Sequence, residues 1–297
     1  MRQMKHHEHH WAGYLCMILS SLAGAIIPTT VKGLSFFLST VMIYFLTRLF
    51  SSVGLISLVF EKGKASLRTR NFLQIFWMTF FYNAATVYYF IAVSHIPLMN
   101  ASLLFNTAPL YIPLIASWTI GEKISHKIWF GISISFVGVM LILQPGMDLF
   151  NPYALFAVVS GIFMACCQVL NRRLTAKEPA SLLVTYLVLF SIFFSFLTVI
   201  FSDWKGDISR WLAQSDPWIW IGVLILSGLA SWTFQILRTH AVRLTKVGLV
   251  MPFSYFGVLF VAISGWIFFK QVPDLYSIIG SCIVIVGCIF ILRYRKT

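Results

Sequence analysis

Two arginines inside apolar stretches are the residues of this sequence best suited to bind a charged ligand. Arg48 lies near the middle of the apolar run 35–60, and Arg238 lies about one helical turn inside the end of the run 217–240. A charge at the centre of a bilayer costs at least about 2.5 kcal/mol, so it faces the protein interior or a wet cavity, or snorkels. The sequence leaves three roles open for each arginine: binding an anionic substrate, bonding to polar groups of the protein, or reaching the interface.

Polar side chains with helical spacing accompany these charges. Asn83 and Thr86 share one helix face beside Tyr89, and Gln235 lies one turn before Arg238. In the next run, polar or helix-breaking residues form a stripe at i, i+4, i+7 and i+11: Ser102, Asn106, Pro109 and Pro113. Such residues either line a binding site or hold helices together, and a hydrogen bond between membrane helices contributes about 0.6–2 kcal/mol.

Prolines inside the runs predict kinks and freed carbonyl groups. Pro109, Pro113 and Pro252 each remove one backbone donor, and Pro28 does the same in the first run. Such breaks are tolerated in a membrane where a neighbouring helix or a cavity satisfies the carbonyls.

Other reactive groups are scarce. Apart from Asp274, the first residue of the run 274–293, no Asp or Glu lies within an apolar run, which argues against an enzyme and against the usual carboxylate proton carrier. His95 and His240, at the ends of runs, are interpreted as interfacial residues. The five cysteines lie in apolar runs without a CxxC pattern, which favours packing. The segment MRQMKHHEHH could ligate a metal, but a solvated basic tail is the expectation; no metal site and no cofactor are predicted.

An internal repeat must position these residues. Shifting the sequence by 149 positions places residues 92–143 on 241–292 without a gap and with nine identities. Gly131 and Gly138 meet Gly280 and Gly287, which predicts close helix packing in both copies. The same shift pairs Thr86 with Gln235 and Asn106 with Tyr255, so these polar residues are expected to face one central site.

Composition and length indicate a polytopic membrane protein. The chain of 297 residues is 59% hydrophobic and only 10% charged, whereas soluble domains carry about 25% charged residues. A transmembrane helix needs about 20 apolar residues. Ten candidate spans follow: 11–31, 35–60, 71–93, 98–120, 126–144, 152–171, 180–202, 217–240, 247–269 and 274–293.

Charge placement orients these spans. With the N-terminus in the cytoplasm, basic residues fall 17 on the cytoplasmic side and 4 on the other, with Arg48 inside a span. Positive-inside bias therefore predicts a multi-pass protein of the cytoplasmic (inner) membrane with both termini in the cytoplasm, and it explains the net charge of +13 without nucleic acid. Because each half holds five spans, an odd number, the two halves are expected to be inverted.

The chain resembles the EamA family of the drug/metabolite transporter superfamily. The resemblance is carried by NAATVYYFIAVSHIPLMNASLLFNTAPLYIPLIASWTIGEKI with the Gly131/Gly138 span, and by a second copy ending GWIFFKQVP with Gly280/Gly287. It implies an all-α fold of ten helices in two inverted five-helix repeats around a cavity. The family's cavity-lining spans carry over onto these residues: Asn83, Tyr89, Asn106, Gln168, Gln235, Arg238 and Tyr255.

Two departures from the family pattern concern its turns and kinks. The second copy has Lys270-Gln271 where the first has Gly121-Glu122, so a gating role of Glu122 has no counterpart in the second half. Pro252 lies six positions before the place that matches Pro109, so the kinks are not symmetric.

The expected organisation is a cytoplasmic basic tail (1–10), a first repeat (11–144), a linker (145–151), a second repeat (152–293) and a short cytoplasmic tail (294–297). The expected function is secondary transport of a small organic metabolite by alternating access, through exchange or facilitated transport. Arg48, Arg238 and Lys32 favour a carboxylate- or phosphate-bearing substrate, while an amino-acid or nucleoside-like one stays open. The alternative is a lipid or lipid-precursor flippase. The expected partners are the bilayer and the substrate, with a homodimer left open.

Overall fold

The chain forms helices in nearly all the residues that the structure, a computed structural model, describes. These residues are 2–52, 69–120, 125–143, 151–175, 177–178, 180–200, 206, 209–211, 217–244 and 251–294. No strand occurs among them, and six helices are long and apolar enough to cross a membrane. The protein is therefore an all-α, multi-pass membrane protein, as the sequence predicts.

The first half contains these helices: α1 (Arg2–Leu34), α2 (Thr40–Ser51), α4 (Phe72–His95), α5 (Leu98–Phe105), α6 (Ala108–Ile120) and α7 (His126–Leu143). The second half contains α8 (Tyr153–Thr175), α9 (Ala180–Ile200), α11 (Pro217–Leu244), the 3₁₀ turn η1 (Met251–Tyr255), α13 (Phe256–Phe269) and α14 (Leu275–Tyr294). Helices occupy all ten predicted stretches, and two of those stretches are interrupted.

One interruption falls within the predicted span 98–120. It divides at Asn106 and Thr107 into α5 and α6, so Ser102, Asn106 and Pro109 do not share one continuous helix. Pro109 lies in the first turn of α6, where a missing amide hydrogen costs no helical bond, while Pro113 lies inside α6. The matching stretch of the second half passes through η1, which contains Pro252, before α13 begins.

The second helix begins later than residue 35. Residues 35–38 form a turn, and the Ser39 side chain accepts a hydrogen bond of 3.3 Å from the Met42 amide at the start of α2. A serine that caps the first turn in this way favours the observed start over one at residue 35. Pro28 lies inside α1. Glu122 lies outside the described residues.

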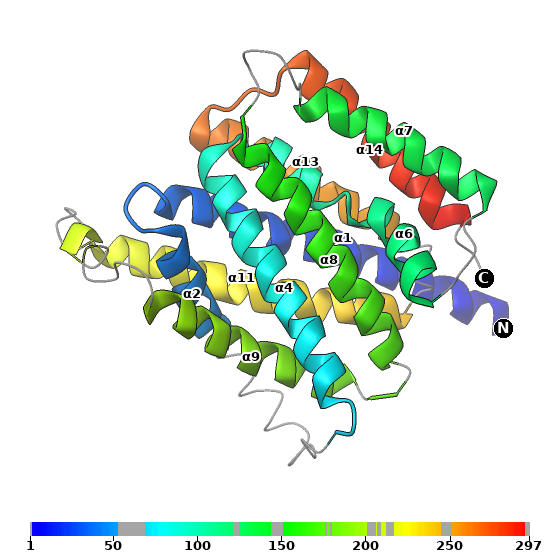
Figure 1. The fold of residues 1–297 in the computed structure, drawn as a ribbon, viewed down its shortest axis with the longest axis horizontal. Coiled ribbons are helices and arrows are strands. Elements are labelled where there is room, and N and C mark those ends of the chain that lie inside the picture. Colours follow the sequence, from blue (N-terminus) through cyan, green and yellow to red (C-terminus); the bar gives the residue numbers. More distant parts are fainter. Residues whose placement is uncertain are drawn as a thin grey trace.

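Two bundles, each mixing helices of both halves, make up most of the protein (Figure 1). The α1 bundle contains α1, α2, α11, η1 and α13. The α4 bundle contains α4, α5, α6, α8 and α9. The packing is two-fold symmetric: α1 packs on α11 as α8 packs on α4, and α2 packs on α11 as α9 packs on α4. This is the arrangement that a duplicated five-helix unit produces.

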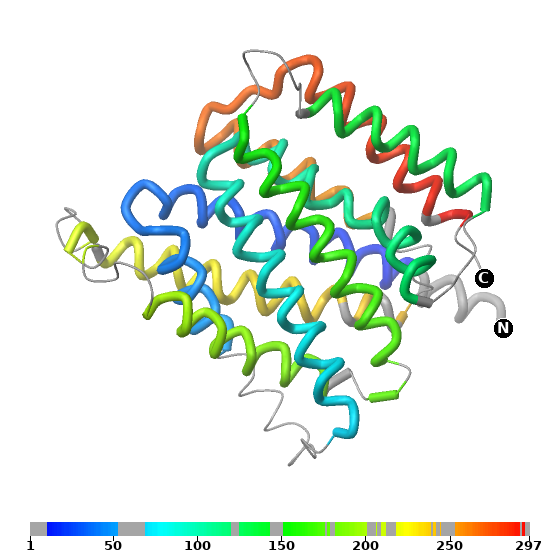
Figure 2. The backbone as a smooth tube through the Cα atoms, viewed as in Figure 1, coloured from blue at the N-terminus to red at the C-terminus, as the bar shows by residue number. Residues whose placement is uncertain are grey.

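Helices α7 and α14 pack along each other at one edge of the molecule (Figure 2). Gly138 lies against Gly280, and Gly131 lies against Gly287. Residue numbers rise along one helix as they fall along the other, so the pair is antiparallel, which fits inverted halves. The predicted small-residue faces thus allow the close backbone approach.

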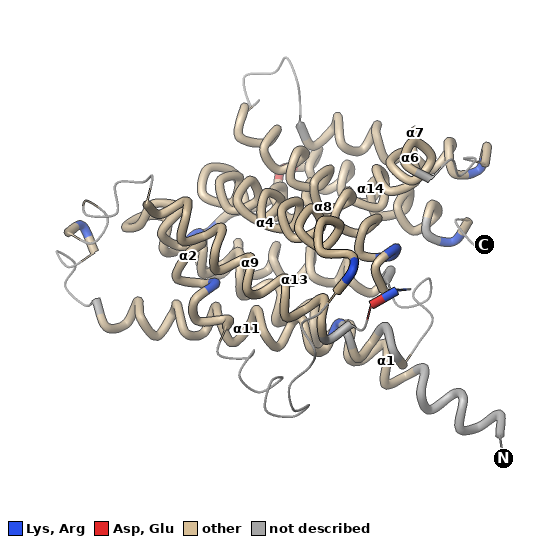
Figure 3. The backbone as a smooth tube through the Cα atoms, turned by 60° about the horizontal axis from the view of Figure 1, so that its bottom comes forward, with Lys and Arg blue, Asp and Glu red and all other residues tan. Residues whose placement is uncertain are grey.

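The bundles have two ends, which we name after a residue near each. The Lys32 end holds the ends of α1, α4 and α13 and the starts of α2, α5, α8 and α14. The Arg172 end holds the ends of α8, α11 and α14. In Figure 3 the basic residues concentrate towards the Arg172 end, near the C-terminus, with few inside the bundle.

Candidate functional site

A polar face on α4 lies at mid-depth between the two bundles. The Asn83 side chain donates to the Thr79 carbonyl at 2.6 Å, and the Thr86 hydroxyl donates to the Tyr82 carbonyl at 2.9 Å. The Thr86 hydroxyl and one N–H of Asn83 are thus used within their own helix, one turn back. This keeps the acceptor oxygens of Asn83 and Thr86 available for groups from other helices.

Arg48 reaches this face from α2. Its Nη1 donates to the Tyr82 hydroxyl at 3.3 Å, and its Nη2 donates to Thr86 Oγ1 at 3.2 Å. The guanidinium also lies 5.3 Å and 5.2 Å from the ring centroids of Tyr44 and Tyr82. Because Arg48 is only 8% exposed, these two hydroxyls and two rings take the place of an acidic partner in stabilising its charge.

Two further side chains complete the polar cluster, which we define as Tyr44, Arg48, Tyr82, Asn83, Thr86 and Gln235. The Tyr44 hydroxyl donates to Asn83 Oδ1, and Gln235 Nε2 from α11 donates to the Tyr82 hydroxyl at 3.4 Å. Tyr82 therefore connects the repeat mates Thr86 and Gln235, because its carbonyl accepts from Thr86 and its hydroxyl accepts from Gln235. Sequence reasoning missed Tyr44, although its position one turn before Arg48 on the same helix was a usable signal.

The second pair of repeat mates meets where α5 ends. Asn106 Nδ2 donates to the Ser102 carbonyl at 2.7 Å, and the Tyr255 hydroxyl donates to the Asn106 carbonyl at 3.4 Å. That carbonyl lies at the α5–α6 break, so it has no helical partner of its own. The structure thus brings the two halves together at both matched positions.

Tyr89 lies within the α4 bundle. Its hydroxyl is 2.6 Å from Ser102 Oγ, and its ring stacks on Phe105 with a centroid distance of 4.5 Å. These contacts hold α4 against α5. Gln168 is half-buried on α8, and among the described residues no hydrogen bond connects it to the polar cluster.

Arg238 differs from Arg48 in its surroundings. It is half-buried on α11, one turn from Gln235, and its guanidinium lies 5.6 Å from the Phe234 ring centroid. Within the described part of the chain it makes no hydrogen bond. Its donors are therefore not used by the described protein groups, whereas both Nη atoms of Arg48 are.

Arg48 Nε and Trp232 Nε1 are among the buried donors that lack a partner within the described residues. A buried donor without an acceptor costs about 1–3 kcal/mol, and native proteins leave few such groups. Trp232 lies on α11 two helical turns before Thr239.

No group of three metal-ligating side chains occurs in the described residues, and the side chains of the His-rich N-terminus lie outside them.

A sequence profile matches the chain twice. The profile of the EamA-like transporter family covers residues 11–144 and again residues 151–293. A solved crystal structure aligns with a TM-score of 0.57 over 98% of this chain and 99% of its own, at 17% identity, which shows a shared fold alone.

Curated relatives match over nearly their full lengths. The pseudopaline exporter of Pseudomonas aeruginosa is 26% identical over 96% of this chain and 97% of its own. The S-adenosylmethionine uptake transporter of Rickettsia bellii is 23% identical, covering 95% and 93%. The riboflavin transporter of Vibrio cholerae is 25% identical, covering 98% and 96%. These relatives are named as transporters, for different cargoes and for both directions.

Proposed function

The chain belongs to the EamA-like transporter family, and we propose that it carries a small organic metabolite with a carboxylate or phosphate group across the cytoplasmic membrane by alternating access. Transport of a small metabolite is what the relatives' names have in common. The choice of an anionic substrate depends on the charges of this chain. The names of the relatives do not favour one cargo, because they cover three different molecules.

The observation that carries the proposal is the state of Arg238. Its guanidinium makes no hydrogen bond to a described residue, yet it lies half-buried beside Gln235 in a span region without any Asp or Glu. A guanidinium binds carboxylate or phosphate through two parallel N–H donors, which an ammonium cannot do. An anionic group of the substrate would supply the missing acceptor.

Arg48 has a different role in this proposal. Its two terminal nitrogens already donate to Tyr82 and Thr86, and two rings cover its charge. We therefore assign it to positioning Tyr82 and Thr86, with its positive charge adding to the attraction for an anion. Asn83, Gln235 and Tyr255 would face the rest of the substrate, with Asn106, Tyr89 and Gln168 behind or beside them.

Exchange or facilitated transport fits the composition of the spans better than proton coupling. Coupled carriers commonly move protons through buried carboxylates, and the spans of this chain contain none. The excess of basic residues near the Arg172 end supports a cytoplasmic location for that end and for both termini.

Uptake into proteoliposomes tests the proposal. Vesicles holding the purified protein are offered labelled carboxylates, phosphate esters, neutral amino acids and nucleosides, with and without the same compound inside. We expect saturable, counterflow-stimulated uptake of an anionic compound that does not depend on an imposed pH gradient. Uptake of neutral compounds alone, or movement of labelled lipid between leaflets without metabolite uptake, would contradict it.

A further inference from the structure

Apolar contacts between the two bundles are unevenly distributed along their length. The largest core cluster joins both bundles near the Lys32 end, where Val31 and Ile43 of the α1 bundle pack with Phe90, Val93 and Leu98 of the α4 bundle. These five side chains are at most 1% exposed. The bundles are therefore sealed against each other at this end.

At the Arg172 end the apolar clusters stay within one bundle. Met17 packs with Ala241 inside the α1 bundle. Two other clusters lie inside the α4 bundle, one around Met78 and Leu174 and one around Ile112. Among the described residues, no cluster at this end joins the two bundles to each other.

Hydrogen bonds show the same asymmetry. At the Lys32 end, Thr40 Oγ1 of α2 lies 3.4 Å from Ser94 Oγ of α4, and the Leu98 amide donates to Gln271 Oε1 at 3.0 Å. The first bond links the α1 bundle to the α4 bundle, and the second links the turn that follows α13 to the α4 bundle. At the Arg172 end the side-chain bonds among described residues remain internal, as in Arg173 to the Thr119 carbonyl at 2.8 Å.

Lys32 makes the strongest of these links. Its Nζ donates to the Val93 carbonyl at 3.2 Å and to the Ile96 carbonyl at 2.5 Å, and the side chain is 7% exposed. Val93 lies in the last turn of α4, whose carbonyls lack helical partners, and Ile96 directly follows the helix. An ammonium ion there satisfies them and complements the negative end of the helix dipole. A residue that the sequence suggested for anion binding thus binds backbone of the opposite bundle.

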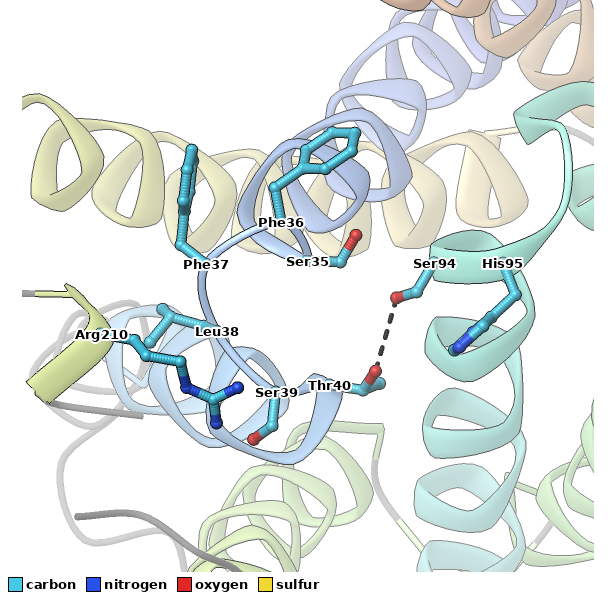
Figure 4. A pocket seen from close by; sticks show the side chains of 9 residues that line it. All are labelled: Ser35, Phe36, Phe37, Leu38, Ser39, Thr40, Ser94, His95 and Arg210. Carbon is cyan, nitrogen blue, oxygen red and sulfur yellow. Dashed lines mark hydrogen bonds between the residues drawn. The ribbon is translucent and has the colours of Figure 1, made fainter. Parts of the chain in front are cut away.

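A polar cavity of about 330 Å³ lies beside this link at the Lys32 end. Figure 4 shows Thr40 and Ser94 facing each other, with His95 next to Ser94. The cavity is lined by the α1–α2 turn and the start of α2 from one bundle, by the end of α4 from the other, and by Arg210. Separation of the bundles at this point would widen the cavity towards the mid-depth cluster.

We propose that Lys32 is the latch of a gate at this end, closed in this structure, and that its release from the Val93 and Ile96 carbonyls lets the two bundles part here and meet at the Arg172 end. The proposal rests on the proposed transport function. It makes Lys32 a positioning residue of the conformational cycle and removes it from the substrate site. The latch is specific because it joins a charged side chain of α1 to helix-end carbonyls that only the closed arrangement brings within reach.

Hydrogen–deuterium exchange of the nanodisc-embedded protein tests the latch without any substrate. In Lys32→Gln we expect amide exchange over residues 89–105 to rise by about tenfold, as loss of a charge-assisted hydrogen bond implies. Exchange at residues 108–119 and 235–244 should fall, because the bundles then meet at the Arg172 end. Lys127→Gln is the matched control; Lys127 lies 4.8 Å from the Tyr294 ring, away from the gate.

A purely structural cap would raise exchange at 89–105 without lowering it at the other end, and that outcome would overturn the proposal. A rise throughout the chain would overturn it too, since Lys32 would then support the whole fold. Lys32→Arg, which keeps a cationic donor, should restore most of the original pattern.

A disulfide across the gate gives a second, independent measurement. Thr40→Cys with Ser94→Cys joins the two bundles, whereas Thr29→Cys with Ser264→Cys joins α1 to α13 inside one bundle, where the hydroxyls are 2.8 Å apart. With the native cysteines replaced, oxidation of the first pair should abolish the reciprocal exchange change of Lys32→Gln, and oxidation of the second should not. If both pairs, or neither, abolish it, the gate is not at this position. Failure of the proteoliposome screen would leave these results unaffected.

Discussion

Gly138 and Gly280 pack backbone against backbone: the carbonyl oxygen of each lies 2.8 Å from the point where the other would carry a Cβ atom. A methyl group there would overlap with a carbonyl that belongs to a helix and cannot turn away. The contact between α7 and α14 therefore depends on glycine at both positions.

Gly138→Ala should destabilise the protein by about 1–3 kcal/mol, because overpacking at a helix interface forces the two backbones apart. Thermal unfolding in detergent measures the effect. Gly222→Ala is the control, since nothing lies within 4 Å of the place where its new methyl group would stand on α11. Equal stability of the two variants would show that α7 and α14 do not pack as described.

Tyr82→Phe should destabilise the polar cluster by about 1–3 kcal/mol. The substitution removes the oxygen that accepts from Arg48 and from Gln235, so Arg48 Nη1 loses its acceptor next to the Arg48 Nε that already lacks one. Tyr88→Phe is the matched control on the same helix, because the Tyr88 ring stacks on Phe156 and its hydroxyl bonds to no described residue. Similar unfolding temperatures for the two variants would argue against the cluster.

Arg238→Gln should lower transport of an anionic substrate by at least about tenfold in kcat/KM, as expected when a charge-assisted hydrogen bond is lost. The protein's stability should change little, since no described residue depends on Arg238 for a hydrogen bond. Arg48→Gln should instead lower stability along with transport. Proteoliposome uptake and thermal unfolding, measured on both variants, separate the two arginines; unchanged transport in Arg238→Gln would remove the basis for an anionic substrate.

Glu178 links the turn after α8 to the start of α4, and we expect the strength of this link to depend on pH. Glu178 Oε1 accepts from the Thr69 hydroxyl at 2.6 Å and from Asn71 Nδ2 at 2.9 Å, and these bonds hold the pKa of the carboxyl below its usual value of 4.5. A depressed pKa in the folded state stabilises the protein above the unfolded-state pKa, and the effect is lost as pH falls through the folded-state pKa.

We therefore expect Glu178→Gln to be less stable than the parent protein at neutral pH, with the difference shrinking as pH falls below the usual carboxyl pKa of 4.5. Thermal unfolding of both proteins across this range provides the measurement. A difference that stays constant with pH would mean that the charge of Glu178 does not contribute.

The helices and their repeat could be predicted because they depend on local composition and spacing. The shift of 149 positions identified Thr86 with Gln235 and Asn106 with Tyr255, and both pairs lie where the halves meet. The sequence could not predict which residues of α7 and α14 contact each other, because Gly138 packs on Gly280 and not on its repeat mate Gly287. An internal alignment gives equivalent positions, whereas contact depends on where the symmetry axis lies.

The role of Lys32 could not be read from the sequence either. Its acceptors are main-chain carbonyls 61 and 64 residues away, and carbonyls carry no residue type that a pattern could reveal. Tyr44 was missed for a related reason, since an aromatic residue in an apolar run is the common case. The α5–α6 break was expected at prolines but occurs just before Pro109, because proline favours the start of a helix.

The protein contains the reciprocal glycine contact twice, so a mutation at one contact can be compared with the equivalent mutation at the other. Gly131 and Gly287 repeat the arrangement of Gly138 and Gly280 on the other side of the pseudo-symmetry axis. A substitution at one site therefore has an equivalent substitution in the same polypeptide, which is studied in the same lipid and at the same temperature. The gap between the two phenotypes would measure directly how far the duplicated halves have diverged in the tasks they perform.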